Sequence, residues 1–153
     1  MKNNLLRVQP IRNGTVIDHI KADRGKKILD ILDLSRIGTT ISLLINVQSK
    51  IQIRKDIIKI EDRELNEVEI EKLALLSPDV IVNIIRNYAV SEKKKIEIPS
   101  LITGLVQCPN ENCICNNEKY VDSKFKLLNK ETLQIQCTYC KRKIEEEDIT
   151  FIY

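Results

Sequence analysis

Short apolar runs alternate with polar segments over the first hundred residues, and they show two periodicities. Runs that are short and rich in Ile, Val and Thr favour β-strands, whereas apolar residues spaced three or four positions apart favour helices. We therefore predict strands at residues 5–11, 15–20, 40–47, 56–60 and 80–85, the last continuing through Asn87 and Tyr88 to Val90.

Two stretches between these runs carry helical signals. Asp23 can cap a helix whose apolar positions include Ile28, Ile31 and Leu32, and Gly38 ends that segment. A second helix is predicted from Asn66, because Glu69 three positions on completes the pattern of a capping box.

The predicted order is strand, strand, helix, strand, strand, helix, strand. Helices separated by pairs of strands favour an α+β fold in which both helices cover one face of an antiparallel sheet. We expect a ferredoxin-like topology.

The pattern changes near residue 100. Residues 91–99 (SEKKKIEIP) are charged and end in proline, so they are the candidate boundary between a domain at residues 1–99 and a second at residues 100–153. The second region has short apolar stretches separated by polar turns, which predicts a small all-β domain. About fifty residues bury little core, so such a domain needs a disulfide or metal staple.

All five cysteines fall in this second region. Two close pairs, separated by a longer stretch, have the layout of a tetrahedral four-thiolate zinc site. The predicted ligands are Cys108, Cys113, Cys137 and Cys140. Four protein ligands leave no position for water, so we expect one structural zinc ion per chain and no hydrolytic chemistry.

Cys115 is left over by this assignment. It lies two residues from Cys113 and could compete as a ligand. Disulfides and a redox or catalytic cysteine are the alternatives to zinc. The odd number of cysteines argues against a full disulfide framework, and a reducing compartment argues for metal.

Composition and charge argue against several classes of function. The chain has 153 residues, a formal net charge of +3 and a single histidine. The mild charge alone does not support nucleic-acid binding, and one histidine argues against Ser-His-Asp catalysis and multi-histidine metal sites. We find no membrane-spanning run and no signal peptide, so we predict a cytoplasmic protein without membrane association.

The lone histidine adds a second candidate site. His19 follows Asp18 near the end of a predicted strand, and Lys55 and Lys59 share one face of another, about 13 Å apart. The two lysines could flank an extended nucleotide, with His19 as a further phosphate-binding group. The alternatives are a satisfied histidine and solvated lysines, including a solvated run at residues 93–95.

Several motifs appear in an order that resembles one family over nearly the whole chain. They are GTVIDHI at residues 14–20, RKDIIKIE at 54–61, Val82-Asn83 with Asn87-Tyr88, CPNENCI at 108–114, and Cys137-x-Tyr-Cys140. This combination is similar to the regulatory chain of aspartate carbamoyltransferase.

The resemblance implies a non-catalytic subunit that controls an early step of pyrimidine biosynthesis. It implies an N-terminal domain that binds the effectors ATP, CTP and UTP and forms a dimer with a second copy. It also implies a zinc domain that contacts the catalytic chain, in an assembly of two catalytic trimers and three regulatory dimers.

Carried over by motif, the resemblance implies a nucleotide pocket formed by Val8, Gln9, Ile11, Asp18, His19, Lys55, Lys59, Asn83, Ile85, Tyr88, Val90 and Lys93. His19 and Lys93 would meet the phosphates. Gln9 replaces an acidic residue that many relatives have there. The competing hypothesis is a zinc-ribbon protein that binds nucleic acid through its basic segments, whereas the resemblance implies no nucleic-acid partner.

Overall fold

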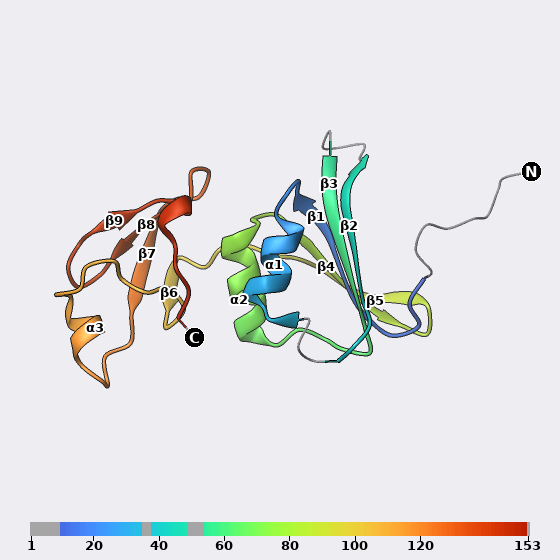
Figure 1. Ribbon diagram of the computed structural model, residues 1–153, viewed down its shortest axis with the longest axis horizontal. Helices are drawn as coiled ribbons and strands as arrows, with labels where there is room; N and C mark the ends of the chain where they lie inside the picture. Colours follow the sequence, from blue (N-terminus) through green and yellow to red (C-terminus); the bar gives the residue numbers. More distant parts are fainter. Residues whose placement is uncertain (1–9, 35–37, 49–53, 153) are drawn as a thin grey trace, which may run out of the picture. The chain divides into compact units, whose positions relative to one another are not determined.

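The computed structural model describes residues 10–34, 38–48 and 54–152 (Figure 1). The chain divides into two compact units, the first ending at Glu97 and the second beginning at Ile98. Each unit has its own sheet and its own buried apolar side chains, so each is described separately.

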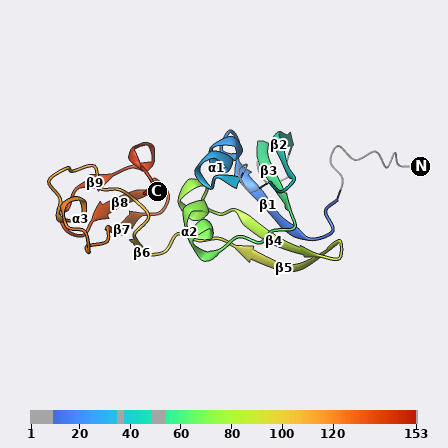
Figure 2. The ribbon, with the colours of Figure 1, turned by 60° about the horizontal axis from the view of Figure 1, so that its bottom comes forward.

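The first unit is a five-stranded antiparallel sheet with two helices on one face (Figures 1 and 2). Its strands lie in the order β2-β3-β1-β4-β5. Along the chain the elements are β1 (Gly14–Lys21), α1 (Gly25–Ile31), β2 (Ile41–Gln48), β3 (Arg54–Glu61), α2 (Glu67–Leu76), β4 (Ile81–Arg86) and β5 (Ala89–Lys95). The first six elements have the ferredoxin-like βαββαβ order, with β5 added at one edge, which confirms the predicted α+β class.

Alternation along the strands builds the core of this unit. Ile17 on β1 pairs with Ile58 on β3 and with Val82 on β4, and all three side chains are fully buried. Successive side chains along a strand point to opposite faces of the sheet, so the residues that alternate with these buried ones lie on the face without helices. That face is called the open face below.

The predicted capping box of α2 is confirmed. Asn66 Oδ1 accepts a hydrogen bond from the Glu69 backbone N–H at 2.8 Å, and Glu69 Oε1 accepts one from the Asn66 N–H at 3.1 Å. Arg63 Nη2 holds the other carboxylate oxygen of Glu69 at 2.7 Å. These bonds satisfy backbone donors that the first turn of the helix leaves free.

The predicted cap of α1 is wrong. Asp23 has a positive φ of 71° and precedes the N-cap residue Arg24, which makes no side-chain capping bond. The buried Asp56 on β3 takes this role, because its Oδ2 accepts from the Gly25 N–H at 2.9 Å and its Oδ1 from the Asn46 N–H at 3.0 Å. A Cβ at Gly25 would lie 2.7 Å from Leu43 Cδ1 and 3.0 Å from Asp56 Oδ2, so a side chain there would displace these two groups.

The expected strand at residues 80–85 is present as β4, but its predicted continuation to Val90 is wrong, because the chain reverses at Asn87 and Tyr88. Both residues have positive φ, 51° and 64°, as in the type I′ turns that close two-residue hairpins. β5 therefore begins at Ala89, and most of the candidate boundary segment at residues 91–99 is strand. Of the strand predicted at residues 5–11, Pro10 and Ile11 are non-strand, and residues 5–9 lie outside the described part.

The second unit is a small antiparallel sheet in the order β6-β7-β8-β9. Phe125 and Ile135 form its centre, and an isolated bridge pairs Val106 with Phe151. The elements are β6 (Leu101–Thr103), α3 (Ile114–Asn117), β7 (Lys124–Asn129), β8 (Gln134–Cys137), β9 (Lys143–Ile144) and the 3-10 helix η2 (Glu146–Asp148). A small β domain was expected, and α3 adds a single helical turn.

Candidate metal centre and ligand-binding face

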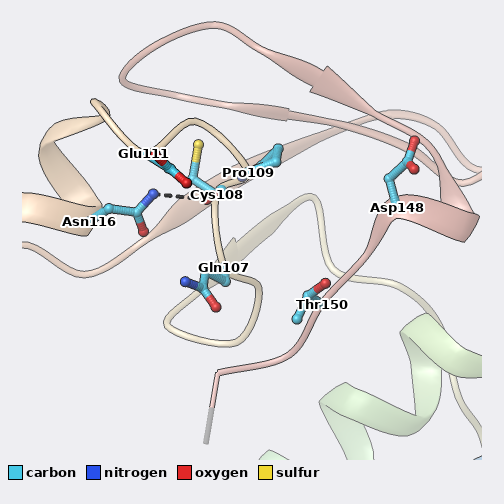
Figure 3. Close-up of a pocket in the computed structure, with 7 residues that line it drawn as sticks. All are labelled: Gln107, Cys108, Pro109, Glu111, Asn116, Asp148 and Thr150. Carbon is cyan, nitrogen blue, oxygen red and sulfur yellow. Dashed lines mark hydrogen bonds between the residues drawn. The ribbon is translucent and has the colours of Figure 1, made fainter.

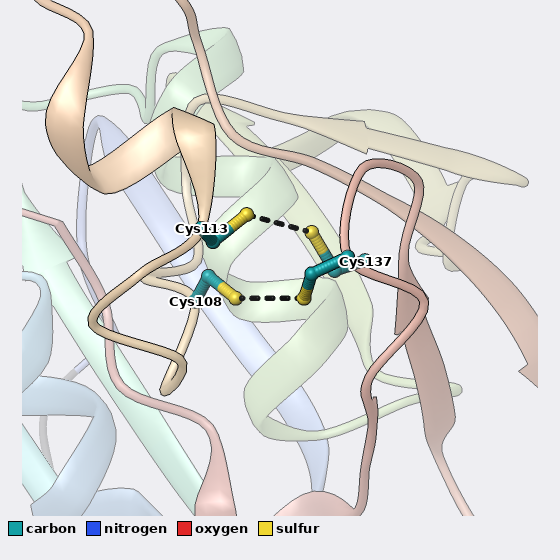
Figure 4. A group of neighbouring side chains, drawn as sticks. Cys108, Cys113 and Cys137 are labelled. Atoms are coloured by element: carbon teal, nitrogen blue, oxygen red, sulfur yellow. Dashed lines mark hydrogen bonds between the residues drawn. The ribbon is translucent and has the colours of Figure 1, made fainter.

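The four predicted ligands in the second unit come together. Cys108 lies in the loop after β6, Cys113 directly precedes α3, Cys137 ends β8, and Cys140 lies in the following turn. Their Sγ atoms all lie within 4.8 Å of one another. The separations are 3.6 Å for Cys108–Cys140 and 3.7 Å for Cys113–Cys137 (Figure 4).

These separations fit a tetrahedral metal site. Four sulfurs bound at about 2.3 Å around one ion lie about 3.8 Å from each other. A disulfide would instead bring two sulfurs to about 2.05 Å, and all five cysteines are free. The four thiols can therefore hold a single ion without rearrangement of the loops.

Asparagine side chains fix the first ligand loop. Asn116 Nδ2 donates to the carbonyls of Cys108 and Asn110, at 2.8 and 2.7 Å, and Asn117 Nδ2 donates to the Cys113 carbonyl at 2.8 Å. The sequence reasoning did not single out these residues. The repeated asparagines between residues 110 and 117 were the available signal, because Asn amides commonly bond to nearby backbone in turns.

The second ligand loop is a tight turn stabilised by its backbone. The Cys137 N–H donates to the Arg142 carbonyl at 2.9 Å, and the Lys141 N–H donates to the Cys137 carbonyl at 3.0 Å. Lys141 has a positive φ of 65° that closes the turn. This turn presents Cys137 and Cys140 toward the first loop.

Burial disfavours the thiolate form of the cysteines in this cluster. Desolvation raises the pKa values of the Cys108 and Cys137 thiols, and neighbouring thiols add to the rise. For Cys140, burial also raises the pKa, but hydrogen bonds led by the Arg142 backbone N–H and the Asn110 side chain outweigh it and lower the value to about 7. Four thiolates together therefore need a cation, which is what a divalent metal supplies.

The fifth cysteine stands beside the four. Cys115 Sγ lies 3.4 Å from Cys113 Sγ, and Cys115 is partly exposed whereas Cys113 is buried. Burial and the Cys113 thiol raise the pKa of Cys115 to about 12.

A cavity of about 400 Å³ adjoins the first ligand loop (Figure 3). Glu111 and Asp148 line it with carboxylates, so it repels phosphate rather than binding it. Its lining residues are Gln107, Cys108, Pro109, Glu111, Asn116, Asp148 and Thr150.

On the first unit, strand register aligns three of the predicted nucleotide-binding residues. Val16 pairs with Lys59 on β3 and with Asn83 on β4, and Asn83 pairs with Lys93 on β5. Paired residues share a face of the sheet, so Lys59, Asn83 and Lys93 form one row across the open face. Lys59 and Lys93 are separated by three strand spacings, about 14 Å.

A second predicted pair lies beside this row. Lys55 Nζ contacts Asp18 Oδ1 at 2.9 Å, and both side chains are largely buried. His19 has a positive φ of 60° at the bulge in β1 between Ile17 and Ile20. Its Nδ1 is buried, lies 3.7 Å from Asp18 Oδ1 and has no hydrogen-bond partner among the described residues.

The remaining predicted residues lie at the hairpin end of the sheet. Ile85 pairs with Gly14 and Val90, while Val90 and Tyr88 are strongly exposed. Ile11 is buried. Arg12, which follows it in the sequence, accepts a hydrogen bond at its backbone carbonyl from the Tyr88 N–H at 2.9 Å. The predicted Val8 and Gln9 lie outside the described residues.

Comparisons with known proteins match both units. Residues 6–97 match the family described as the aspartate carbamoyltransferase regulatory chain, allosteric domain. Residues 100–150 match the metal binding domain of the same regulatory chain. Among the described residues, no helix is long and apolar enough to cross a membrane.

Similar full-length chains bear the same name. The aspartate carbamoyltransferase regulatory chain of Pyrococcus horikoshii is 49% identical over 146 residues, covering 94% of this chain and 95% of the relative. That of Saccharolobus solfataricus is 44% identical over 149 residues, covering 97% and 94%. That of Methanothermobacter thermautotrophicus is 41% identical over 144 residues, covering 94% and 92%.

The fold, the cysteine cluster and the two family matches thus define a non-catalytic chain with an allosteric domain and a metal-binding domain. The chain belongs to the family of aspartate carbamoyltransferase regulatory chains. The resemblance stated from the motifs is confirmed, and the nucleic-acid alternative is not favoured.

Proposed function

We propose that this chain is the regulatory subunit of an aspartate carbamoyltransferase holoenzyme and that its open face binds the effectors ATP, CTP and UTP. The observation that carries the proposal is the register that aligns Lys59, Asn83 and Lys93 in one row. Two cations separated by an amide suit a nucleotide, since the amide can read the base or ribose while a lysine binds phosphate.

The surroundings of the row support the same ligand. His19 Nδ1 has no hydrogen-bond partner among the described residues, and protonated histidine binds phosphate. The apolar Ile85 and Val90 offer a surface for a base near the hairpin. The ion pair between Asp18 and Lys55 places a carboxylate where it can accept a hydrogen bond from ribose hydroxyls.

For the second unit we propose zinc as the metal, bound by Cys108, Cys113, Cys137 and Cys140. Four thiolates in a tetrahedron are the usual ligands of structural zinc, and no position remains for a reacting water. The ion would fold the surface that contacts the catalytic chain. Five free thiols are consistent with a reducing cytoplasm.

The proposed regulation couples the two units through the holoenzyme. Regulatory chains would pair through their first units, and three such dimers would join two catalytic trimers. A nucleotide changes the activity only if it binds two states of the assembly with different affinity. A coupling free energy of about 1–3 kcal/mol would change apparent substrate affinity about 5- to 150-fold.

The test is reconstitution with the catalytic chain, with activity measured against ATP, CTP and UTP and binding measured by calorimetry. Lys93→Ala should weaken nucleotide binding on the order of ten- to hundredfold, the value of one charge-assisted hydrogen bond. Lys94→Ala is the matched control, because Lys94 pairs with the buried Val82 and so lies on the opposite face of β5.

Equal effects of the two substitutions would place the site elsewhere. A reconstituted enzyme whose activity ignores all three nucleotides would contradict the regulatory proposal itself.

A further inference from the structure

We propose that Cys115 is an oxidation site that switches the metal centre. A hydroperoxide that enters the cavity beside Cys115 would join Cys115 to Cys113 in a disulfide and remove one ligand from the metal. The inference rests on the metal site proposed above, and it assigns a role to the cysteine that the site does not use.

The geometry brings a spare thiol against a ligand. Cys115 Sγ lies 3.4 Å from Cys113 Sγ, the shortest of the three thiol contacts described in the cluster. Cys113 precedes the first turn of α3 and Cys115 lies within that turn. A disulfide between them would shorten this separation to about 2.05 Å.

Access favours Cys115 over three of the four ligands. Cys108, Cys113 and Cys137 are buried, whereas Cys115 and Cys140 are partly exposed, and of these two only Cys115 lines a cavity of about 410 Å³. Exposure is one of the two factors that make a thiol susceptible to oxidation, the other being its thiolate character. An oxidant that arrives through this cavity therefore meets Cys115 before it meets Cys113.

The cavity also carries groups that can bind a peroxide. Asn116 and Lys119 line it together with Ser123. Ser123 is only 4% exposed, and its buried Oγ has no hydrogen-bond partner among the described residues. A buried hydroxyl without a partner is costly, and a small polar molecule in the cavity would satisfy it.

The chemistry balances with a hydroperoxide as the oxidant. The O–O bond breaks, one oxygen passes to the Cys115 sulfur as sulfenic acid, and the other leaves as water or alcohol. The Cys113 thiolate then attacks the Cys115 sulfur, the S–O bond breaks, and hydroxide takes a proton and leaves as water. The two sulfurs lose two electrons, which the peroxide gains.

The consequence is loss of the closed site. Three thiolates remain after the disulfide forms, and metal affinity falls because the fourth ligand is gone. A reducing thiol would reverse the bond, so the change would act as a switch rather than as damage.

The test uses the purified full chain loaded with zinc and challenged with hydrogen peroxide. Zinc release is followed with a chromogenic chelator, and the oxidised chain is mapped by peptide mass spectrometry. We expect zinc release together with a mass loss of about 2 Da, the two thiol hydrogens, in a peptide that links Cys113 to Cys115. Cys115→Ser should bind zinc normally and lose this release.

The outcomes separate the two proposals. A chain that binds no zinc before the challenge contradicts the metal site itself. Bound zinc that leaves equally fast from wild type and Cys115→Ser overturns the switch alone, as does a wild-type disulfide that does not join Cys113 to Cys115. The mapping is made on wild type, so it stands even if the variant folds poorly.

Discussion

The two units are stabilised in different ways. In the first, fully buried Ile17, Ile58 and Val82 on the sheet lie beneath helices that contribute Leu73. In the second unit, β6 has three residues and β9 only two. The buried side chains of this unit include three of the four cysteines of the cluster. Apolar burial grows with chain size, so a unit as small as residues 98–153 gains less from it.

The difference indicates where each unit is vulnerable. The first depends on apolar packing and on buried polar groups such as Asp56 that join its elements. The second has two loops distant in sequence that the proposed metal ion would join. Substitutions in the first unit should therefore leave metal binding unchanged, and metal removal should leave the first unit folded.

The largest expected effect is that of metal loss on the second unit. Structural zinc contributes about 10–16 kcal/mol of binding free energy in small zinc domains, and this is also folding free energy. Chelation, or Cys137→Ser at a fully buried ligand, should unfold residues 98–153 and release the chain from its catalytic partner. Size-exclusion chromatography and amide hydrogen exchange measure the two effects.

Cys115→Ser is the control for this prediction, because it removes a thiol from outside the group of four. Nucleotide binding by the first unit should persist in the metal-free chain. An assembly of unchanged size after complete metal removal would show that the metal does not maintain the contact.

The features that could be predicted from the sequence are those encoded by residues close together in the chain. The capping box of Asn66 and Glu69 spans three residues, and the four ligands follow a known spacing, so both were predicted. The cap of α1 was missed because Asp56 lies 31 positions from Gly25 and reaches it only through the sheet. The hairpin was missed because Asn87 and Tyr88 include no glycine to mark the turn.

The open face shows the same limit. Family motifs suggested Lys59, Asn83 and Lys93, but their alignment depends on the register of four strands, which no local pattern encodes. His19, whose Nδ1 has no hydrogen-bond partner in the part of the chain that the structure describes, likewise lies at a bulge in β1 that the apolar pattern did not reveal.

A smaller effect is expected from Asp56→Asn in the first unit. The carboxylate accepts two backbone hydrogen bonds, and an amide would turn an N–H₂ group toward one of the two donors. The loss should be about 2–3 kcal/mol of unfolding free energy, because hydrogen bonds to charged groups are worth about this much. Urea denaturation measures it, with zinc content recorded in parallel.

The exposed Asp79→Asn, which makes the same chemical change at the surface, is the matched control for Asp56. An Asp56→Asn chain that loses zinc would break the comparison between the units, because it would couple a buried group of the first to the metal of the second.

The smallest effect should come from the N-cap of α2. Asn66→Ala removes the side-chain acceptor for the Glu69 N–H and should cost about 1 kcal/mol in urea denaturation. Asn66→Asp keeps an acceptor at the same position and adds a negative charge at the positive end of the helix, so it should recover the lost stability. If Asn66→Asp were as unstable as Asn66→Ala, the cap would not stabilise the helix. Because the cap lies wholly within the first unit, neither substitution should change the metal affinity.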